Sequence, residues 1–439
     1  MSQHIRVTDE KKSFNIAILG FGTVGEGVYW ALQKKSDKIS SILGREINIP
    51  LVLVANRTKK RNIKKQTNVT DQLADVLKER QLDAVIEATP DAETAYPYVK
   101  QLLEHGISII SANKELIAKH GEELHVLAGD NHCHLLFEAT VAGGIPVLNT
   151  IRHTLKANSI ERFEGILNGT SNFILSKMRE EGTSFSDALG EAQEKGYAEL
   201  VPDKDIDGWD AYYKTMIVSR WIYGRAPIWK NSPRGIRNVS LSDIKIGEHF
   251  NGRIKHVASL VKKDGEVHAA VQPCFVLNDH PLYGVEGVNN GIRIDGSIVG
   301  SIMLQGPGAG KYPTASAMVE DMINLFMSRH ENLSIEGIEF STEGFLDQEK
   351  QKSIDQITSG DGAYWFVTGE EGIVRSISAL GVEIIQAAET ACIVYGRENQ
   401  LSQWKERSCA KVRVYPVLSD FRKLISNRSF FEREKTVSI

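Results

Sequence analysis

The feature of the sequence that constrains the fold most is a run of closely spaced glycines, Gly20-Phe21-Gly22-Thr23-Val24-Gly25. It follows an apolar run, 16–19, and opens an amphipathic stretch from about 24 to 43, which predicts a strand, a tight turn and a helix. In such a unit the first glycine permits the turn, the second lets the backbone approach a pyrophosphate, and the third lets the helix pack closely on the strand. The phosphate then lies at the helix N-terminus. The run therefore predicts a dinucleotide-binding βαβ unit.

Strands and helices continue to alternate as far as about residue 140. The expected strands are at 51–54, 84–88, 107–110 and 135–137, and the expected helices are at 94–104 and 114–128. This alternation is typical of an α/β fold with a doubly wound parallel sheet, the Rossmann arrangement.

The remainder of the chain predicts two further parts. Helical signals at 185–193 and 209–222 and strand-like runs at 271–277 and 298–304 indicate an α+β domain. An amphipathic segment at 317–327 precedes a charged stretch at 348–361, which predicts a linker. The last part has the order strand, helix, strand, strand, helix, strand, with expected strands at 364–367, 382–385, 391–395 and 410–414. That order predicts a small ferredoxin-like module.

Composition excludes several classes of protein. With 52 Lys and Arg against 56 Asp and Glu, the net charge of −4 gives no global field for binding nucleic acid or an anionic membrane. The four cysteines, Cys133, Cys274, Cys392 and Cys409, show no C-x-x-C spacing, so we expect neither disulfides nor zinc. No apolar run reaches the roughly 18 residues of a membrane span, and the N-terminus is polar. We expect a cytoplasmic protein.

The end of the second expected strand bears on the choice of cofactor. NAD-binding sites commonly have an acidic residue there, which binds the ribose 2′-hydroxyl, but this chain has Asn56 and Arg57, followed by Lys59, Lys60 and Arg61. A guanidinium suits a 2′-phosphate because it offers several fixed donors and neutralises charge. The segment favours NADP and leaves NAD possible. A solvated basic turn is the alternative for Lys59 to Arg61.

An acidic segment follows Glu199. Asp203, Asp205 and Asp207 match the first half of a calcium-binding EF-hand loop, but the twelfth position, which requires a bidentate Glu, is Lys214. The alternative is a helix on which Asp210 and Lys214, four residues apart, point into one cleft. An ordinary surface salt bridge has the same spacing, and spacing alone favours it.

A second glycine-rich segment, 306–311, reads Gly-Pro-Gly-Ala-Gly-Lys. It is not the phosphate loop of an NTPase, because that motif requires Gly at the position of Gln305 and Ser or Thr at the position of Tyr312. Its glycines still indicate close approach of the backbone to a ligand or to another helix.

Seven segments, in this order and spacing, resemble those of the homoserine dehydrogenase family. They are GFGTVG (20–25), SANKELIA (111–118), EATVAGGIPV (138–147), GILNGTSNFIL (165–175), EAQEKGYAE (191–199), DIDGWDAYYK (205–214) and GPGAGKYPTASAMVED (306–321). The resemblance covers the chain from about 14 to 330. It implies NAD(P)-dependent interconversion of L-homoserine and L-aspartate 4-semialdehyde in threonine and methionine biosynthesis.

The resemblance also implies how the chain is organised. It divides the chain into an NADP-binding Rossmann domain over 1–148 that is completed by about 306–335, a catalytic and dimerisation domain over 149–305, and a divergent ACT-like module over 362–439. We expect a homodimer or homotetramer that binds no nucleic acid and no membrane.

Residue roles carried over from the family fit the chemistry of the reaction. Hydride transfer at the substrate's terminal carbon needs an acid/base group near its oxygen, and by resemblance this group is Lys214. Glu199, Asp205 and Asp210 are the implied substrate-binding carboxylates. The implied cofactor-binding residues are Gly20, Phe21, Gly22, Thr23, Val24, Gly25, Arg57, Lys114, Gly196 and Gly308.

The family also carries a monovalent cation site. Its ligands map onto the carboxylate of Glu138 and the backbone carbonyls of Val141, Gly143 and Ile145, a set of oxygens that suits sodium. The alternative is a Glu138 that caps a helix beside a flexible Gly143-Gly144 turn.

Two departures from the family pattern keep rival functions open. The family usually has Asp-Pro two residues after the glutamate. Here Glu199 is followed by Leu200, Val201 and Pro202. A dehydrogenase for another small amino or hydroxy acid is therefore a rival. In the C-terminal module, Gly369-Glu370-Glu371-Gly372 replaces the usual acidic-Pro-Gly turn, which raises the rival of an NADP-sensing regulatory protein. The retained Lys114, Glu199, Asp210 and Lys214 argue against a non-catalytic sensor.

Overall fold

The computed structural model describes residues 13–79, 81–330, 362–408 and 411–419, and these form two compact units. The first unit takes the described parts of Met1–Ala157, Tyr213–Ala226 and Gly306–Ser341, and the second takes those of Asn158–Tyr212, Pro227–Gln305 and Thr342–Ile439. The linker expected at 348–361 and Cys409 lie outside the described residues. None of the helices in the described ranges combines the length and the apolar character that a membrane span requires.

A six-stranded parallel sheet lies at the centre of the first unit. Its strands are β1 (Ser13–Leu19), β2 (Glu46–Leu53), β3 (Asn68–Thr70), β4 (Ala84–Glu87), β5 (Ser108–Ser111) and β6 (Leu135–Leu136). They lie side by side in the order β3-β2-β1-β4-β5-β6, all parallel. The predicted parallel Rossmann sheet is confirmed. The strand order reverses at β1 and β4, and in such sheets nucleotides bind beyond the carboxyl ends of the strands at that point.

Helices follow the strands in the expected alternation. They are α1 (Thr23–Lys34), α2 (Ser36–Leu43), α3 (Leu73–Lys78), α4 (Ala92–Glu104) and α5 (Lys114–Asp130), then the short α6 (Ala139–Ala142), α7 (Val147–Asn149) and a π-helical turn, Thr150–Thr154. The prediction of one helix over 24–43 is wrong. The chain leaves helical geometry at Lys35, with φ −111° and ψ 15°, so that α1 ends and α2 begins there.

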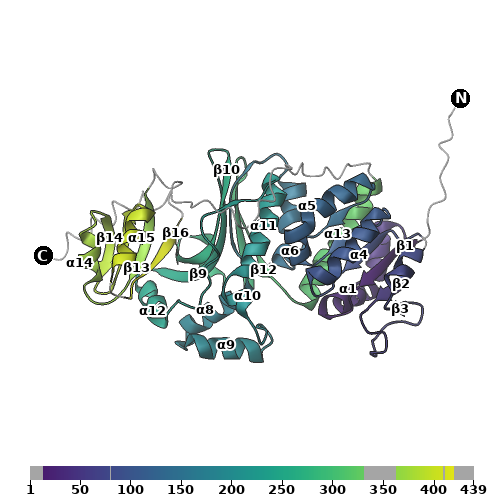
Figure 1. Ribbon diagram of the computed structural model, residues 1–439, viewed down its shortest axis with the longest axis horizontal. Helices are drawn as coiled ribbons and strands as arrows, with labels where there is room; N and C mark the ends of the chain where they lie inside the picture. The colour runs from purple at the N-terminus through teal and green to yellow at the C-terminus, as the bar shows by residue number, and fades with distance from the viewer. Residues whose placement is uncertain (1–12, 80, 331–361, 409–410, 420–439) are drawn as a thin grey trace. The chain divides into compact units, whose positions relative to one another are not determined.

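The helix α13 (Lys311–His330) belongs to the first unit although it comes from far along the chain. It packs against α1, and a Cβ on Gly27 would lie 2.6 Å from the carbonyl oxygen of Lys311, so only glycine fits there (Figure 1). Met318 and Met322 of α13 are buried in the same core as Ile16 of β1. The helix expected at 317–327 therefore exists and begins earlier, at Lys311.

A mixed sheet forms the second unit. Its strands are β7 (Ile160–Ile166), β8 (Ile228–Trp229), β9 (Gly252–Lys263), β10 (Glu266–Leu277), β11 (Asn289–Gly296), β12 (Gly300–Pro307), β13 (Ala363–Thr368), β14 (Glu383–Ala388), β15 (Ala391–Gly396) and β16 (Arg413–Leu418). Their order is β12-β11-β7-β9-β10-β16-β13-β15-β14, and β8 also pairs with β10.

The helices of the second unit include several that the sequence did not predict. They are α8 (Gly169–Glu181), α9 (Phe185–Glu194), α10 (Asp203–Ile206), the start of α11 (Trp209–Tyr223), α12 (Leu241–His249), α14 (Ile373–Ser378) and α15 (Glu398–Arg407), with a 3-10 turn at Pro281–Gly284. Among these, α8, α10 and α12 have no counterpart in the sequence prediction.

The strand predicted at 298–304 starts before the observed strand does. Ile298 and Val299 lie in the turn between β11 and β12, and Ile298 is 73% exposed. The strand β12 begins at Gly300, which has a φ of 76°. Two apolar residues in an exposed turn imitate the start of a buried strand, which explains the error.

The C-terminal part, β13 to β16, has the element order strand, helix, strand, strand, helix, strand, and its strands lie in the order β16-β13-β15-β14. The strand expected at 410–414 is displaced to Arg413–Leu418. Because β16 pairs with β10 through Phe275 and Val417, this part continues the sheet of the second unit.

The carboxylate of Asp243 on α12 ties this C-terminal part to the rest of the second unit. Asp243 is 2% exposed, and it accepts hydrogen bonds from the Oγ1 of Thr368 at 2.6 Å, the hydroxyl of Tyr415 at 3.0 Å and the hydroxyl of Ser240 at 2.7 Å. Arg413 lies 3.3 Å from the same carboxylate. A buried charge is thus paired and hydrogen-bonded, as its burial requires.

Three cysteines, Cys133, Cys274 and Cys392, lie in the described residues; each is buried, and none of them is in a disulfide with another of the described residues.

Candidate active site

The glycine turn before α1 is shaped to admit a phosphate. A Cβ on Gly20, whose φ is 86°, would lie 2.4 Å from the carbonyl oxygen of Ala88, and a Cβ on Gly25 would lie 2.1 Å from the carbonyl oxygen of Gly20. A Cβ on Gly22 would meet nothing within 4 Å. Gly22 is also the N-cap of α1 and supplies no side-chain hydrogen bond to the helix. The backbone N–H groups of this helix start therefore fit a pyrophosphate.

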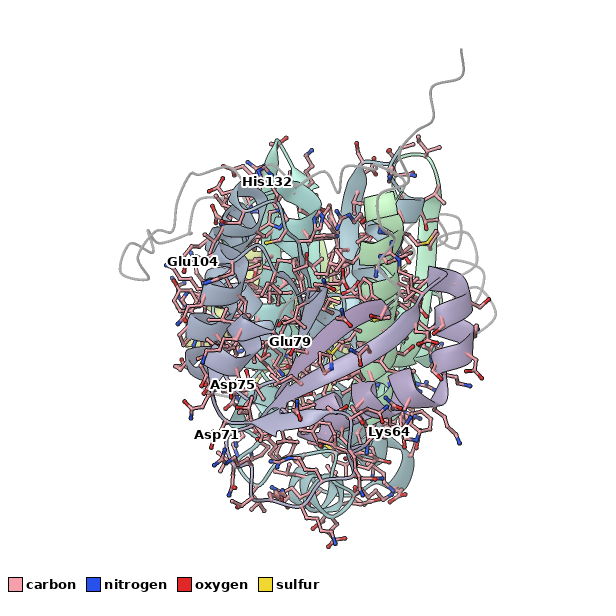
Figure 2. All side chains as sticks on the ribbon, turned by 90° about the vertical axis from the view of Figure 1, so that its right-hand side faces the viewer. Lys64, Asp71, Asp75, Glu79, Glu104 and His132 are labelled. Atoms are coloured by element: carbon pink, nitrogen blue, oxygen red, sulfur yellow. The ribbon has the colours of Figure 1, made fainter. Side chains whose placement is uncertain are left out.

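Arg57 is exposed just beyond β2. Its side chain is 66% exposed, and its Nε lies 3.9 Å from the carboxylate of Asp71. Asp71 begins the segment that leads from β3 into α3 (Figure 2). Asn56 turns the backbone locally, since its Oδ1 accepts hydrogen bonds from the N–H of Thr58 at 2.9 Å and the hydroxyl of Thr58 at 2.7 Å. The guanidinium of Arg57 is thus accessible to a 2′-phosphate.

The alternative of a solvated basic turn describes the neighbours of Arg57 well. Lys59 and Lys60 are exposed, and Arg61 donates from its guanidinium to the carbonyl oxygen of Lys59 at 2.8 Å. Their charges lie in a local turn.

Lys114 is the first residue of α5, beyond the carboxyl end of β5. Asn113 caps this helix, because its Oδ1 accepts the N–H of Leu116 at 3.0 Å. The Oγ of Ser111 accepts the N–H of Asn113 at 3.0 Å and donates to the carboxylate of Glu87 at 2.5 Å. These hydrogen bonds fix the start of α5, of which Lys114 is the first residue.

The sequence did not predict that Glu87 belongs to this hydrogen-bond network. It ends β4, is fully buried, and accepts hydrogen bonds from the N–H and the hydroxyl of Thr89 at 2.7 Å and 2.6 Å. Burial raises the pKa of its carboxyl, and the hydrogen bonds from Ser111 and Thr89 oppose the rise. The signal in the sequence is an acidic residue at the end of an otherwise apolar strand.

The carboxylate of Glu138 caps a short helical segment of the first unit. It accepts the N–H of Leu148 at 3.0 Å and that of Asn149 at 2.5 Å. This is the capping arrangement that the sequence left open as an alternative. The nearby Gly143 has a φ of 56°, and the carbonyl oxygen of Ile145 accepts the N–H of Val147 at 2.8 Å.

A second buried carboxyl, that of Asp321 on α13, lies beside Glu138. Its oxygens accept the backbone N–H of Glu138 at 2.9 Å and the side-chain amide of Asn149 at 3.0 Å. Burial, together with the charge of Asp321, raises the pKa of Glu138 to about 8, and burial raises the pKa of Asp321 to about 6. The two buried acids thus lie together, with hydrogen bonds from backbone N–H groups and one side-chain amide.

The segment around Gly308 approaches the turn that carries Gly143. A Cβ on Gly143 would lie 2.5 Å from the carbonyl oxygen of Gly308, and the N–H of Gly144 donates to the carbonyl oxygen of Pro307 at 3.2 Å. The Nζ of Lys311 then lies 2.8 Å from the carboxylate of Glu26 on α1. The glycines at 306–310 thus allow the chain to run close to the loop beside α6.

The acidic segment of the second unit splits into two groups. Asp203 and Asp207 both pair with Arg237, whose Nε lies 2.5 Å from Asp207. Among the described residues no group of three or more His, Cys, Asp or Glu side chains could hold a metal ion. The guanidinium of Arg237 thus pairs with two of the three aspartates that match the EF-hand pattern.

Asp205 and Asp210 form the second group. The side-chain amide of Asn168 donates to the Oδ1 of Asp205 at 2.8 Å and to the Oδ2 of Asp210 at 2.9 Å. The role of Asn168 was not predicted; the signal for it is an Asn directly before the helix α8, the position of an N-cap. The structure therefore brings two of the three predicted substrate-binding carboxylates together.

The third, Glu199, lies in an exposed segment after α9. Gln193 donates from its side-chain amide to the carbonyl oxygen of Glu199 at 3.0 Å, and the hydroxyl of Thr170 donates to the carbonyl oxygen of Tyr197 at 2.5 Å. Gly196 precedes this segment with a φ of 72° and with open space where a Cβ would be. The segment is held by its backbone, which leaves the carboxylate of Glu199 facing solvent.

Lys214 follows Asp210 by four residues on α11, so the two side chains lie one helical turn apart. Asp210 is 2% exposed and Lys214 is 8% exposed. They are therefore not a solvated surface pair, which was the alternative that spacing alone favoured.

Comparisons with known proteins agree along most of the chain. A family described as homoserine dehydrogenase, NAD binding domain, matches residues 20–138, and one described as homoserine dehydrogenase matches residues 146–323. A homoserine dehydrogenase of Lactococcus lactis is 37% identical over 315 residues, 71% of this chain and 74% of that protein. An NAD(+)-dependent homoserine dehydrogenase of Pseudomonas canavaninivorans is 36% identical over 58% of this chain and 73% of its own length.

Solved structures of homoserine dehydrogenases also resemble this chain. The crystal structure of a homoserine dehydrogenase from Thiobacillus denitrificans is 29% identical, with a TM-score of 0.80 over 93% of this chain and 99% of that one. A hyperthermophilic archaeal homoserine dehydrogenase in complex with NADPH is 30% identical, with a TM-score of 0.63 over 72% of this chain and 98% of that one.

Proposed function

Because this chain belongs to the homoserine dehydrogenase family of NAD(P)-dependent oxidoreductases, we propose that it interconverts L-homoserine and L-aspartate 4-semialdehyde with NADP as its preferred cofactor. The reaction belongs to threonine and methionine biosynthesis. The observation that carries the proposal is the amide of Asn168, which brings the carboxylates of Asp205 and Asp210 together in the second unit. Two adjoining carboxylates suit the ammonium group of an amino-acid substrate.

The first unit supplies the cofactor site. A bound nicotinamide cofactor supplies the hydride acceptor or donor for the substrate's terminal carbon. The turn from Gly20 to Gly25 would hold its pyrophosphate through backbone N–H groups, and Arg57 would neutralise a 2′-phosphate. Lys114, Gly196 and Gly308 complete the residues assigned to the cofactor. The absence of an acidic side chain at the end of β2 favours NADP over NAD.

Lys214 moves the proton. In the direction of reduction its ammonium donates to the oxygen that gains charge at the substrate's terminal carbon, and in the direction of oxidation the neutral amine accepts the hydroxyl proton. Asp205, Asp210 and Glu199 bind the substrate, whose amino group is attracted by their negative charges.

We assign a cation site to the first unit. A monovalent cation such as sodium would be bound by the backbone carbonyls of Val141, Gly143 and Ile145 beside the carboxylate of Glu138. The buried acids Glu138 and Asp321 support this assignment, because a bound cation offsets the repulsion between their charges. Its contribution would be to keep the loop 141–145 in one conformation.

We also propose how the chain is divided into domains and how it assembles. Residues 1–148 with about 306–335 form the NADP-binding domain, 149–305 the catalytic and dimerisation domain, and 362–439 a divergent ACT-like module. The strand order β16-β13-β15-β14 supports the last assignment. The protein acts in the cytoplasm as a homodimer or homotetramer, and its net charge of −4 gives no support for a nucleic-acid or membrane partner.

The experiment follows the absorbance of the reduced nicotinamide with purified protein, L-homoserine and either NADP⁺ or NAD⁺. We expect a homoserine-dependent rise that is faster with NADP⁺. Other small amino and hydroxy acids are assayed in parallel, because Val201 stands where the family has an acidic residue. If protein that binds NADPH oxidises one of these acids and not L-homoserine, the proposed substrate is wrong.

A further inference from the structure

The first turn of α8 connects several parts of the acidic segment. Asn168 is 5% exposed, and both hydrogens of its side-chain amide are used, one by Asp205 at 2.8 Å and one by Asp210 at 2.9 Å. Its Oδ1 accepts the N–H of Ser171 at 2.7 Å and so caps α8. One buried side chain therefore fixes a helix start and two carboxylates that lie 37 and 42 residues away in the sequence.

Neighbouring residues of the same turn hold the adjoining backbone. The hydroxyl of Ser171 donates to the carbonyl oxygen of Asp205 at 2.9 Å. The hydroxyl of Thr170 donates to the carbonyl oxygen of Tyr197, two residues before Glu199. The turn thus anchors each of the stretches that carry the proposed substrate-binding carboxylates.

The choice of an amide has a chemical consequence. Asn168 donates to both carboxylates without adding a positive charge, so it orients them and leaves their negative charge available to a ligand. A lysine or arginine in its place would orient them and also neutralise them. Since the amide is planar, its two N–H groups fix the separation of the two acceptor oxygens.

We propose that Asn168 is a positioning residue that sets the spacing of Asp205 and Asp210 and thereby adapts the site to a substrate with an ammonium group. This inference rests on the proposed function. Asn168 does not touch the reacting atoms; it acts through the two carboxylates. The expected consequence is on the affinity for L-homoserine, with no direct effect on cofactor binding.

Two substitutions separate the capping role from the positioning role. Asn168→Ser keeps an N-cap oxygen and loses the amide, and Asn168→Asp also keeps the cap but replaces the N–H donors with an acceptor. Ser184→Ala is the control, since Ser184 caps α9 by accepting the N–H of Asp187 and is exposed. It removes a cap of a neighbouring helix and leaves the carboxylates in place.

The measurements are the KM for L-homoserine, the pH profile of kcat/KM, the Kd for NADPH and the Tm. We expect the KM to rise about tenfold or more in both variants at position 168, because hydrogen bonds to charged groups orient the carboxylates. In Asn168→Asp a third carboxylate joins the other two, so one of them retains its proton and the acidic limb of the profile moves to higher pH. NADPH binding stays within about twofold of wild type.

The control determines what a negative result means. If wild type is active and both variants at position 168 keep its KM and its pH profile, the inference is overturned. A fall in Tm like that of Ser184→Ala with an unchanged KM would assign Asn168 to capping alone and would also overturn it. If wild type fails to act on L-homoserine, the proposed function itself is contradicted.

Discussion

The carboxylate of Asp321 accepts the backbone N–H of Glu138 at 2.9 Å, so that two buried acids from distant parts of the chain meet in the first unit. Burial and the charge of Asp321 raise the pKa of Glu138 from 4.5 to about 8. The folded protein keeps this proton over a pH range in which the unfolded chain loses it.

This relationship predicts that the free energy of unfolding falls as the pH rises from about 4.5 to about 8, by up to about 5 kcal/mol. The raised pKa of Asp321 acts in the same direction. Asp321→Asn removes one acid and lowers the pKa of the other, so the fall becomes shallower. Urea unfolding at a series of pH values measures it, and Glu104→Gln, at an exposed position of α4, is the control. An equally steep fall in Asp321→Asn would contradict the coupling.

The open space at Gly22 predicts a separation of folding from cofactor binding. Gly22→Ala introduces a Cβ that meets nothing within 4 Å, so the Tm should change little, but the methyl group lies where a pyrophosphate approaches the backbone. The Kd for NADPH should rise about tenfold or more. Gly25→Ala is the contrasting variant, because its Cβ would lie 2.1 Å from the carbonyl oxygen of Gly20 and should destabilise the protein. Tight NADPH binding by Gly22→Ala would place the phosphate elsewhere.

From the exposed guanidinium of Arg57 we predict a preference for NADP⁺ over NAD⁺. Arg57→Gln removes the guanidinium and should raise the KM for NADP⁺ about tenfold, while the KM for NAD⁺ stays within about twofold. Arg61→Gln serves as the control, since the guanidinium of Arg61 donates to the carbonyl oxygen of Lys59. Steady-state kinetics with both cofactors measure the effect. A parallel change for NADP⁺ and NAD⁺ would show that Arg57 does not recognise the 2′-phosphate.

From the hydrogen bonds of Asp243 we predict how much the contact with the C-terminal part adds to the free energy of unfolding. Asp243→Asn places an N–H donor among side chains that donate, those of Ser240, Thr368 and Tyr415, so a buried donor loses its partner. We expect a loss of about 2–4 kcal/mol in the free energy of unfolding. Tyr415→Phe removes one hydrogen bond and should cost about 1 kcal/mol. Urea unfolding followed by far-UV circular dichroism measures both, and equal losses would contradict the central role of the carboxylate.

Local patterns in the sequence were sufficient to predict the parallel sheet. Strands such as β1 and β4 are buried on both faces, which makes them continuous apolar runs, and the glycine turn fixes where the first helix starts. The break at Lys35 was missed because Leu32 and Ile39, on either side of it, keep the helical period. The exposed turn at Ile298 was missed because its apolar residues extend the strand pattern.

The bonds that organise the candidate site could not be predicted from the sequence. Asn168 reaches Asp205 and Asp210 across 37 and 42 residues, and Glu87 meets Ser111 across 24. Such pairs follow from the packing of α8 and of neighbouring strands, and no periodicity in the sequence records that packing. The family resemblance named the carboxylates, and the structure adds the side chain that holds two of them.

We propose that Lys214 transfers the proton when L-homoserine is oxidised, and the kcat of Lys214→Met tests this role. Lys245→Met on α12, an exposed position, is the matched control. We expect kcat to fall by about 10²- to 10⁴-fold in Lys214→Met, the Kd for NADPH to be unchanged, and the control to keep full activity. A Lys214→Met variant that retains wild-type kcat with L-homoserine would show that Lys214 does not transfer the proton.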